Sequence, residues 1–215
     1  MSQSNVAVID YGMGNLLSVC RGLEHCGATV TVTSDLDVIL SASRVVLPGV
    51  GAFADAMTEL CRLGLDAAVR EVGARGTPLM GICLGMQMLL DESDEYGRTA
   101  GLGLIPGRVI PLPTTTITGQ VQKIPHIGWN ELVLPQGRKD WQGTLLQDLK
   151  LGDTVYFVHS FMVSPKNADY RIADCIYGGN PVSAVIARDN VIGCQFHPEK
   201  SGEVGLKVLK RFLLL

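Results

Sequence analysis

Short apolar runs alternate with helical periodicities along the first part of the chain. Four runs rich in β-branched or aliphatic residues have the length of buried strands. They cover residues 5–10, 28–33, 44–47 and 79–83. Helical spacing appears between Asn15, which favours an N-cap, and Gly27. It returns at residues 53–75, with a break near Gly64, and at residues 84–91. This alternation predicts an α/β sandwich with a parallel sheet at its centre.

The pattern changes in the second half. Prolines and glycines are frequent between residues 101 and 141, which favours loops and short antiparallel strands. Further strands are expected at residues 154–159, 171–177, 182–188 and 191–196, and an amphipathic helix at 203–213. Asp189-Asn190 is a plausible hairpin turn. The sequence has no internal repeat or linker, so we expect one domain over residues 1–215. The expected fold is a three-layer α/β sandwich whose mixed, largely parallel sheet is flanked by helices.

Composition narrows the possible partners and the compartment. The net charge is −3 with no basic patch, which argues against nucleic acid or a membrane surface as the main partner. No secretory signal is visible, and no apolar stretch approaches the roughly 20 residues of a membrane helix. The 6 cysteines are widely spread, without the close pairs of a zinc site. We therefore expect a cytoplasmic protein with reduced thiols, no cofactor and no metal.

One cysteine stands out because of its neighbours. Cys83 lies between Gly81 and Gly85, where a buried strand is expected to turn into a helix. A sharp strand-to-helix turn exposes its central residue, and glycines on either side relieve the crowding. The first N–H groups of a helix lack intrahelical partners and favour negative charge, which stabilises a thiolate. We interpret Cys83 as a nucleophile and the other five cysteines as ordinary thiols.

A thiol nucleophile needs a base, and His197 is the best of the four histidines. It precedes Pro198-Glu199, and proline favours an extended backbone at the residue before it. Extended geometry would place His197 and Glu199 on the same side of the chain, so that the carboxylate orients the imidazole. The alternative, a strand-end histidine beside an unrelated glutamate, would be preferred only without the cysteine motif.

These motifs resemble the class I (triad) glutamine amidotransferases. Besides GICLGMQ, five segments carry the resemblance in the expected order. They are DYGMGNL at 10–16, LPGVGAF at 47–53, PHIGWN at 125–130, YFVHSF at 156–161 and HPEKS at 197–201. Within this family the resemblance is closest to the glutaminase subunits of imidazole glycerol phosphate synthases. It covers nearly the whole chain.

The resemblance implies roles for individual residues. Cys83 would attack the side-chain amide of glutamine, and His197 and Glu199 would complete the triad. Two groups of residues would stabilise the oxyanion and hold the substrate. The oxyanion donors would come from Leu84 and from Val50 or Gly51, and the substrate would contact Gly49, Gln87, Ser160 and Phe161. Without the family, Gln87 would be interpreted as an exposed helix residue. The family usually has tyrosine where Phe161 stands, so a role for that hydroxyl is lost.

The resemblance also implies a partner. Ammonia would pass to a cyclase subunit, a (β/α)8 barrel, within a heterodimer that serves histidine biosynthesis. Asn15, Trp129 and Lys200 flank the motifs and are candidate contacts. Core packing is an equal alternative for Trp129. The PGVG loop suggests that the isolated chain is a poor glutaminase.

Three other interpretations compete with a partner-dependent glutaminase. A free-standing cysteine hydrolase would use the same Cys83 and His197, but the PHIGWN and HPEKS segments argue against it. A dinucleotide-binding module after the first strand would need a third glycine at position 17, which is leucine. A regulatory subunit with an inactive site is disfavoured by the intact triad.

Overall fold

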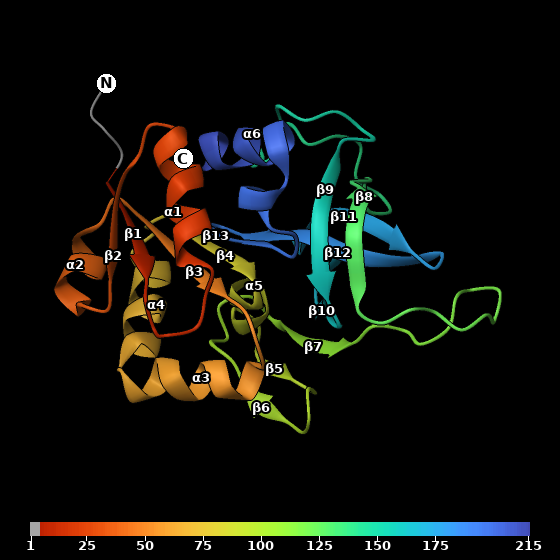
Figure 1. The fold of residues 1–215 in the computed structure, drawn as a ribbon, viewed down its shortest axis with the longest axis horizontal. Helices are drawn as coiled ribbons and strands as arrows, with labels where there is room; N and C mark the ends of the chain where they lie inside the picture. Colours follow the sequence, from red (N-terminus) through yellow and green to blue (C-terminus); the bar gives the residue numbers. More distant parts are fainter. Residues whose placement is uncertain (1–4) are drawn as a thin grey trace.

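A computed structural model describes residues 5–215, and a seven-stranded sheet forms their centre (Figure 1). In spatial order the strands are β11 (Arg171–Tyr177), β12 (Asn180–Arg188), β13 (Val191–Cys194), β4 (Leu79–Cys83), β3 (Arg44–Gly49), β1 (Asn5–Ile9) and β2 (Thr29–Thr33). From β13 to β2 all neighbouring strands are parallel, whereas β11–β12 and β12–β13 are antiparallel. The predicted mixed, largely parallel sheet is therefore confirmed.

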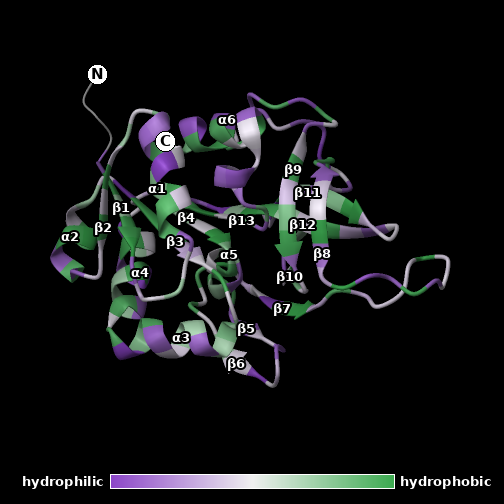
Figure 2. Cartoon of the chain, viewed as in Figure 1, coloured by the Kyte–Doolittle hydropathy of each residue, from purple (hydrophilic) through white to green (hydrophobic). Residues whose placement is uncertain are grey.

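Helices cover both faces of the sheet. The helices are α1 (Leu16–His25), α2 (Leu36–Ser41), α3 (Phe53–Arg62), α4 (Leu65–Ala74), α5 (Leu84–Met88) and α6 (Gly202–Phe212). Figure 1 shows α1 and α6 on one side and α3 and α4 on the other. Val6 and Val8 of β1 pack in the core under α1 and α6, whereas Ala7 and Ile9 pack in the core under α3 and α4. Alternate residues of the strand thus point to opposite faces, so the central strands are hydrophobic throughout (Figure 2).

Residues 92–165 add two smaller sheets beside the main one. One contains β10 (Phe161–Pro165), β7 (Gly107–Pro111), β5 (Glu92–Ser93) and β6 (Thr99–Ala100), and the other pairs β8 (His126–Glu131) with β9 (Thr154–His159). A long connection between β7 and β8 extends away from the body of the protein (Figure 1). No helix formed by residues 5–215 is long and apolar enough to cross a membrane.

Several expectations about individual elements were wrong. The helix after Cys83 ends at Met88 rather than at residue 91, because the carbonyls of Met88 and Leu90 accept hydrogen bonds from Leu102 and Gly103 instead of continuing a helix. Helix α2 and strand β10 were not expected, since both are short and carry weak periodicity. Strand β3 continues through Pro48-Gly49, and β13 ends at Cys194. Asn15 is at the N-cap of α1, but its side chain makes no capping hydrogen bond.

Candidate active site

The turn at Cys83 is sharp and strained. Cys83 ends β4 and has φ 55° and ψ −110°, a backbone conformation that side chains with a Cβ rarely adopt. The flanking glycines make this turn possible. A Cβ on Gly81 would lie 2.6 Å from the carbonyl oxygen of Gly85, and a Cβ on Gly85 would lie 1.8 Å from that of Leu47. Glycine at these two positions therefore lets α5 pack directly on the ends of β4 and β3.

The thiol of Cys83 contacts groups from β9 and from the segment that follows β13. It lies 3.8 Å from the carbonyl oxygen of Val158, to which it can donate, and 3.8 Å from Nε2 of Gln195, from which it can accept. Only 7% of Cys83 is exposed. Cys83 nevertheless lines a cavity, so a small molecule can reach it.

His197 and Glu199 meet beside this cysteine. Nδ1 of His197 lies 2.8 Å from Oε1 of Glu199, and both side chains are almost fully buried. The backbone of His197 is extended, with φ −96° and ψ 98°, as the following proline predicts. The extended geometry expected to continue to Glu199 was wrong, because residues Pro198–Lys200 form a 3-10 turn. The hydroxyl of Ser201 braces this turn, donating to the carbonyl of His197 while accepting from the N–H of Tyr156. This 3-10 turn, rather than an extended segment, therefore places the Glu199 carboxylate next to the His197 imidazole.

The electrostatics of His197 favour its protonated form. Burial alone would lower the pKa of His197, but interactions with the Cys83 sulfur and the Glu199 carboxylate outweigh it and raise the pKa to about 9. Nε2 of His197 is buried and has no hydrogen-bond partner among the described residues. It is the ring atom left for the thiol or for a substrate, since Nδ1 is held by Glu199.

A cavity of about 300 Å³ joins Cys83 and His197 to most of the other expected residues. They lie around its walls. The walls include Val50, Gly51, Leu84, Gln87, Ser160 and Phe161. Gly49 lies just behind this wall. A Cβ there would lie 2.7 Å from the hydroxyl of Tyr11, which donates to the carbonyl of Pro48 at 2.9 Å. Through this hydrogen bond, Tyr11, just after β1, holds the segment that leads into the loop expected to carry an oxyanion donor.

Gln87 is buried, so the interpretation as an exposed helix residue was wrong. Only 5% of it is accessible, and its Nε2 donates to the carbonyl of Phe161 at 3.2 Å and to Oε1 of Gln195 at 3.1 Å. Gln195 in turn reaches Cys83, which links the helix, the substrate segment and the thiol. Gln195 was not expected from the sequence. Its signal was a polar residue inside an otherwise apolar run, and the structure buries it completely.

Glu95 lines the cavity and was also not expected from the sequence. Its Oε2 accepts a hydrogen bond of 2.7 Å from the N–H of Phe53, and 8% of the residue is exposed. Glu95 supplies a carboxylate to the cavity that the thiol of Cys83 also lines. Such a group can bind a cationic ammonium of a ligand.

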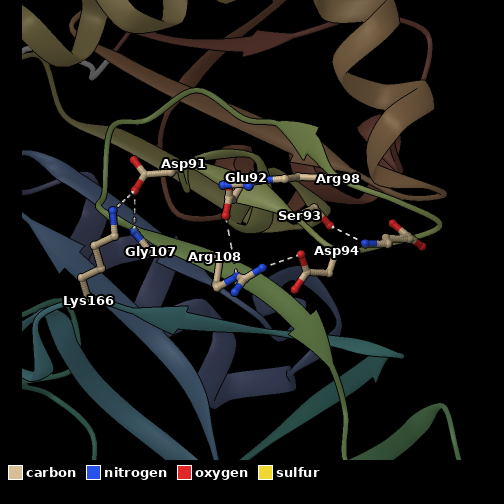
Figure 3. Close-up of polar contacts among 9 residues, drawn as sticks. Asp91, Glu92, Ser93, Asp94, Arg98, Gly107, Arg108 and Lys166 are labelled. Carbon is tan, nitrogen blue, oxygen red and sulfur yellow. Dashed lines mark hydrogen bonds and ion pairs between the residues drawn. The ribbon is translucent and has the colours of Figure 1, made fainter.

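A network of charged side chains braces the short strands on either side of Glu95 (Figure 3). Glu92 of β5 pairs with Arg98 and with Arg108 of β7, and Arg108 also pairs with Asp94. Asp91 accepts from Lys166 and from the N–H of Gly107. These exposed pairs contribute little each, but together they fix the turn at residues 94–97 to the sheet.

The three candidate partner contacts lie outside the cavity. Trp129 is 57% exposed, so core packing is wrong for this residue. Its ring lies edge-on to Tyr156, 6.1 Å between centroids. Lys200 is exposed at the end of the 3-10 turn that carries Glu199, and Asn15 is partly exposed at the start of α1. Among residues 5–215 no group of three or more histidine, cysteine or acidic side chains is arranged to hold a metal ion.

Comparison with known proteins identifies the class. The family described as "Glutamine amidotransferase class-I" matches residues 7–215, and the chain belongs to this family. It is 51% identical over 210 residues to imidazole glycerol phosphate synthase subunit HisH 1 of Legionella pneumophila (strain Lens), covering 98% of this chain and 99% of that one. It is 47% identical over 208 residues to the HisH subunit of Geobacillus thermodenitrificans (strain NG80-2), covering 97% and 94%.

Solved structures agree on the fold. A crystal structure of a glutamine amidotransferase superposes with a TM-score of 0.71 at 16% identity, covering 98% of this chain and 99% of the other. The structure of PurLQS from Thermotoga maritima gives a TM-score of 0.70 at 19% identity, covering 99% and 98%.

Proposed function

We propose that this chain is the glutaminase subunit of imidazole glycerol phosphate synthase and that Cys83, His197 and Glu199 are its catalytic triad. The observation that supports the triad most strongly is the arrangement around one cavity. A strained cysteine and the free nitrogen of an oriented histidine both face this cavity. The similarity to HisH subunits over nearly the whole chain supports the synthase assignment.

The reaction follows from these groups. The Cys83 thiolate attacks the side-chain amide carbon of glutamine, and the C–N bond breaks after His197 donates its proton to the leaving nitrogen, which departs as ammonia. A γ-glutamyl thioester remains. His197 then takes a proton from water as the water attacks the thioester carbonyl, and glutamate and the free thiol are released. Glu199 keeps the imidazole oriented and stabilises its protonated form.

Two further groups of residues assist this chemistry. The N–H of Leu84 follows the nucleophile directly and is one oxyanion donor, and the second comes from Val50 or Gly51 in the adjacent loop. Backbone groups at Ser160 and Phe161 receive the amino-acid end of glutamine, together with Gln87. Glu95 accepts the α-ammonium group of glutamine across the cavity.

The ammonia is used by a partner subunit. We propose that this partner is a cyclase with a (β/α)8 barrel, that it forms a heterodimer with this chain in the cytoplasm, and that ammonia reaches it without entering solvent. Trp129 is the leading contact, because an exposed tryptophan held by a neighbouring ring is suited to an interface anchor. Lys200 and Asn15 are the other two contacts that we propose.

The test is glutamate release from glutamine by the purified chain, alone and with the cyclase subunit and its nucleotide ligand. Low activity alone, a large rise in the complex and loss in Cys83→Ala are expected. Full activity without the cyclase subunit would support a free-standing hydrolase instead. Absence of glutamate release in both settings would contradict the proposed function.

A further inference from the structure

Three of the four histidines have no part in the triad, yet the structure buries two of them side by side. His126 and His159 face each other across the β8–β9 pair and are 3% and 6% exposed. Nδ1 of His126 lies 3.1 Å from Nε2 of His159. Two polar rings in such a position need a reason, because burying a polar group is unfavourable unless its hydrogen bonds are made.

The partners of the two rings fix which nitrogens carry protons. Nδ1 of His159 lies 2.8 Å from the carbonyl oxygen of Phe161, which can only accept, so this nitrogen donates. Nε2 of the neutral His159 ring is then an acceptor, and Nδ1 of His126 donates to it. Nε2 of His126 accepts from Nδ2 of Asn130 at 3.4 Å. The result is a directional chain of three hydrogen bonds from Asn130 to Phe161.

The surroundings keep both rings neutral, so that each ring has one donor and one acceptor nitrogen for this series of hydrogen bonds. The His126 ring stacks between the ring of Phe157, 4.8 Å away, and that of Tyr177, 4.0 Å away. Burial lowers the pKa of His126 to about 4. Burial also lowers the pKa of His159 to about 4, assisted by His126 and His197 and opposed by the hydrogen bond to Phe161.

The series of hydrogen bonds from Asn130 ends at Phe161, on the wall of the active-site cavity. The carbonyl oxygen of Phe161 accepts from both His159 and Gln87, and His159, Ser160 and Phe161 all line the cavity. Asn130, at the other end, is fixed by donating to the carbonyl of Ile176 at 2.9 Å. The peptide that follows Phe161 is therefore held from both sides, by a helix side chain and by the histidine pair.

We propose that His126 and His159 are positioning residues that hold the Ser160–Phe161 backbone in the orientation needed to bind the amino-acid end of glutamine. This inference rests on the proposed glutaminase function. Neither histidine is assigned a proton transfer. Their effect should therefore appear with ligands that carry the α-amino and α-carboxylate groups and should be absent for small reagents that reach Cys83 without them.

The test compares two reagents that alkylate Cys83. One is the diazoketone analogue of glutamine, which retains the amino-acid end, and the other is iodoacetamide, which lacks it. His126→Phe keeps a ring between Phe157 and Tyr177 but cannot donate to His159. With the cyclase subunit present, we expect inactivation by the diazoketone to fall about tenfold, the scale of one lost hydrogen bond, and alkylation by iodoacetamide to stay within about twofold.

Two further variants separate positioning from general damage. Trp141→Phe is the matched control, because it also removes one buried ring N–H donor, which contacts the carbonyl of Ile172 at 2.9 Å away from the cavity. It should change neither rate. Asn130→Leu tests the chain from its partly exposed end if His126→Phe does not fold, and it should lower the same diazoketone rate selectively.

The outcomes distinguish the two proposals. Equal loss with both reagents, or no loss with either in folded variants, would overturn the positioning role. A wild-type protein that iodoacetamide modifies at Cys83 but the diazoketone does not would instead contradict the glutaminase function.

Discussion

Replacing Gly85 by alanine tests whether the close approach of α5 to the sheet builds the active site. The added Cβ would lie 1.8 Å from the carbonyl oxygen of Leu47 and 2.9 Å from its carbon. Leu47 is in the buried strand β3, so the obstacle is backbone and cannot rotate away like a side chain. The helix and the strand would have to separate by a distance on the order of 1 Å.

The expected effect on stability and activity follows from that displacement. Overpacking in a core costs roughly 1–3 kcal/mol, and a backbone clash in the centre of a sheet places Gly85→Ala near the upper end, at about 3 kcal/mol. A domain with a total stability of roughly 5–15 kcal/mol still folds. The same shift moves the N–H of Leu84 relative to Cys83, and misplacement by about 1 Å is expected to reduce glutaminase activity roughly 100-fold.

Urea denaturation and steady-state glutamate release measure the two effects. The matched control is Gly73→Ala in α4, whose Cβ would lie 2.9 Å from a side-chain tip of Leu104, a neighbour that can rotate and does not line the cavity. It should lose less stability and keep its activity. If the free energy of unfolding of Gly85→Ala is within about 1 kcal/mol of the wild-type value and the variant remains fully active, close packing at Gly85 does not build the cysteine turn.

Three further predictions concern the charged and polar groups around the cavity. His197→Ala should slow alkylation of Cys83 by iodoacetamide at pH 7 about tenfold or more, because the protonated ring stabilises the thiolate; an unchanged rate would remove His197 from the site. Glu95→Gln should raise the KM for glutamine about tenfold with little change in kcat, since it removes one charge opposite the α-ammonium, and a kcat effect alone would contradict this role. Finally, the pKa values of His126 and His159 fall to about 4 on folding, so the stability of the neutral pair is present above pH 6.5 and lost as the pH falls towards 4. Urea denaturation of His126→Phe should therefore depend less on pH in this range than that of the wild type.

Structure could be predicted best from the sequence where local chemistry determines it. Gly81 and Gly85 around Cys83 indicated a sharp turn, and the structure has both the turn and the close contacts that require the two glycines. Apolar runs of strand length likewise predicted most of the central sheet. Gly64, with φ 69°, interrupts the helical segment where a break was expected.

Contacts between distant segments could not be predicted from local patterns. The position of Glu95 in the cavity depends on its contact with Phe53, 42 residues away, and the pairing of His126 with His159 depends on the register of β8 and β9. Neither is visible in periodicity. Glu199 shows a related limit: its contact with His197 was expected through an extended chain, whereas a 3-10 turn supplies it.

The strained backbone at Cys83 leads to a last prediction, that glycine at this position gives a more stable fold than alanine does. A side chain with a Cβ at φ 55° and ψ −110° costs about 1–3 kcal/mol, and glycine removes this cost. Glycine also has a more flexible unfolded chain than alanine, which lowers the stability of the folded state by about 0.5–1 kcal/mol. The folded Cys83→Gly variant should therefore be more stable than Cys83→Ala by about 1 kcal/mol net.

Both variants lack the thiol and should be inactive, so activity cannot separate them, whereas urea denaturation can. Alanine is the proper reference because it loses the same sulfur contacts but keeps the Cβ. A Cys83→Gly variant less stable than Cys83→Ala would mean that the turn is not strained. The expected order would instead show that the backbone conformation at position 83 lowers the stability of the fold. This conformation places the Cys83 side chain at the junction of β4 and α5, beside the N–H of Leu84, so the fold is less stable where the proposed nucleophile is positioned.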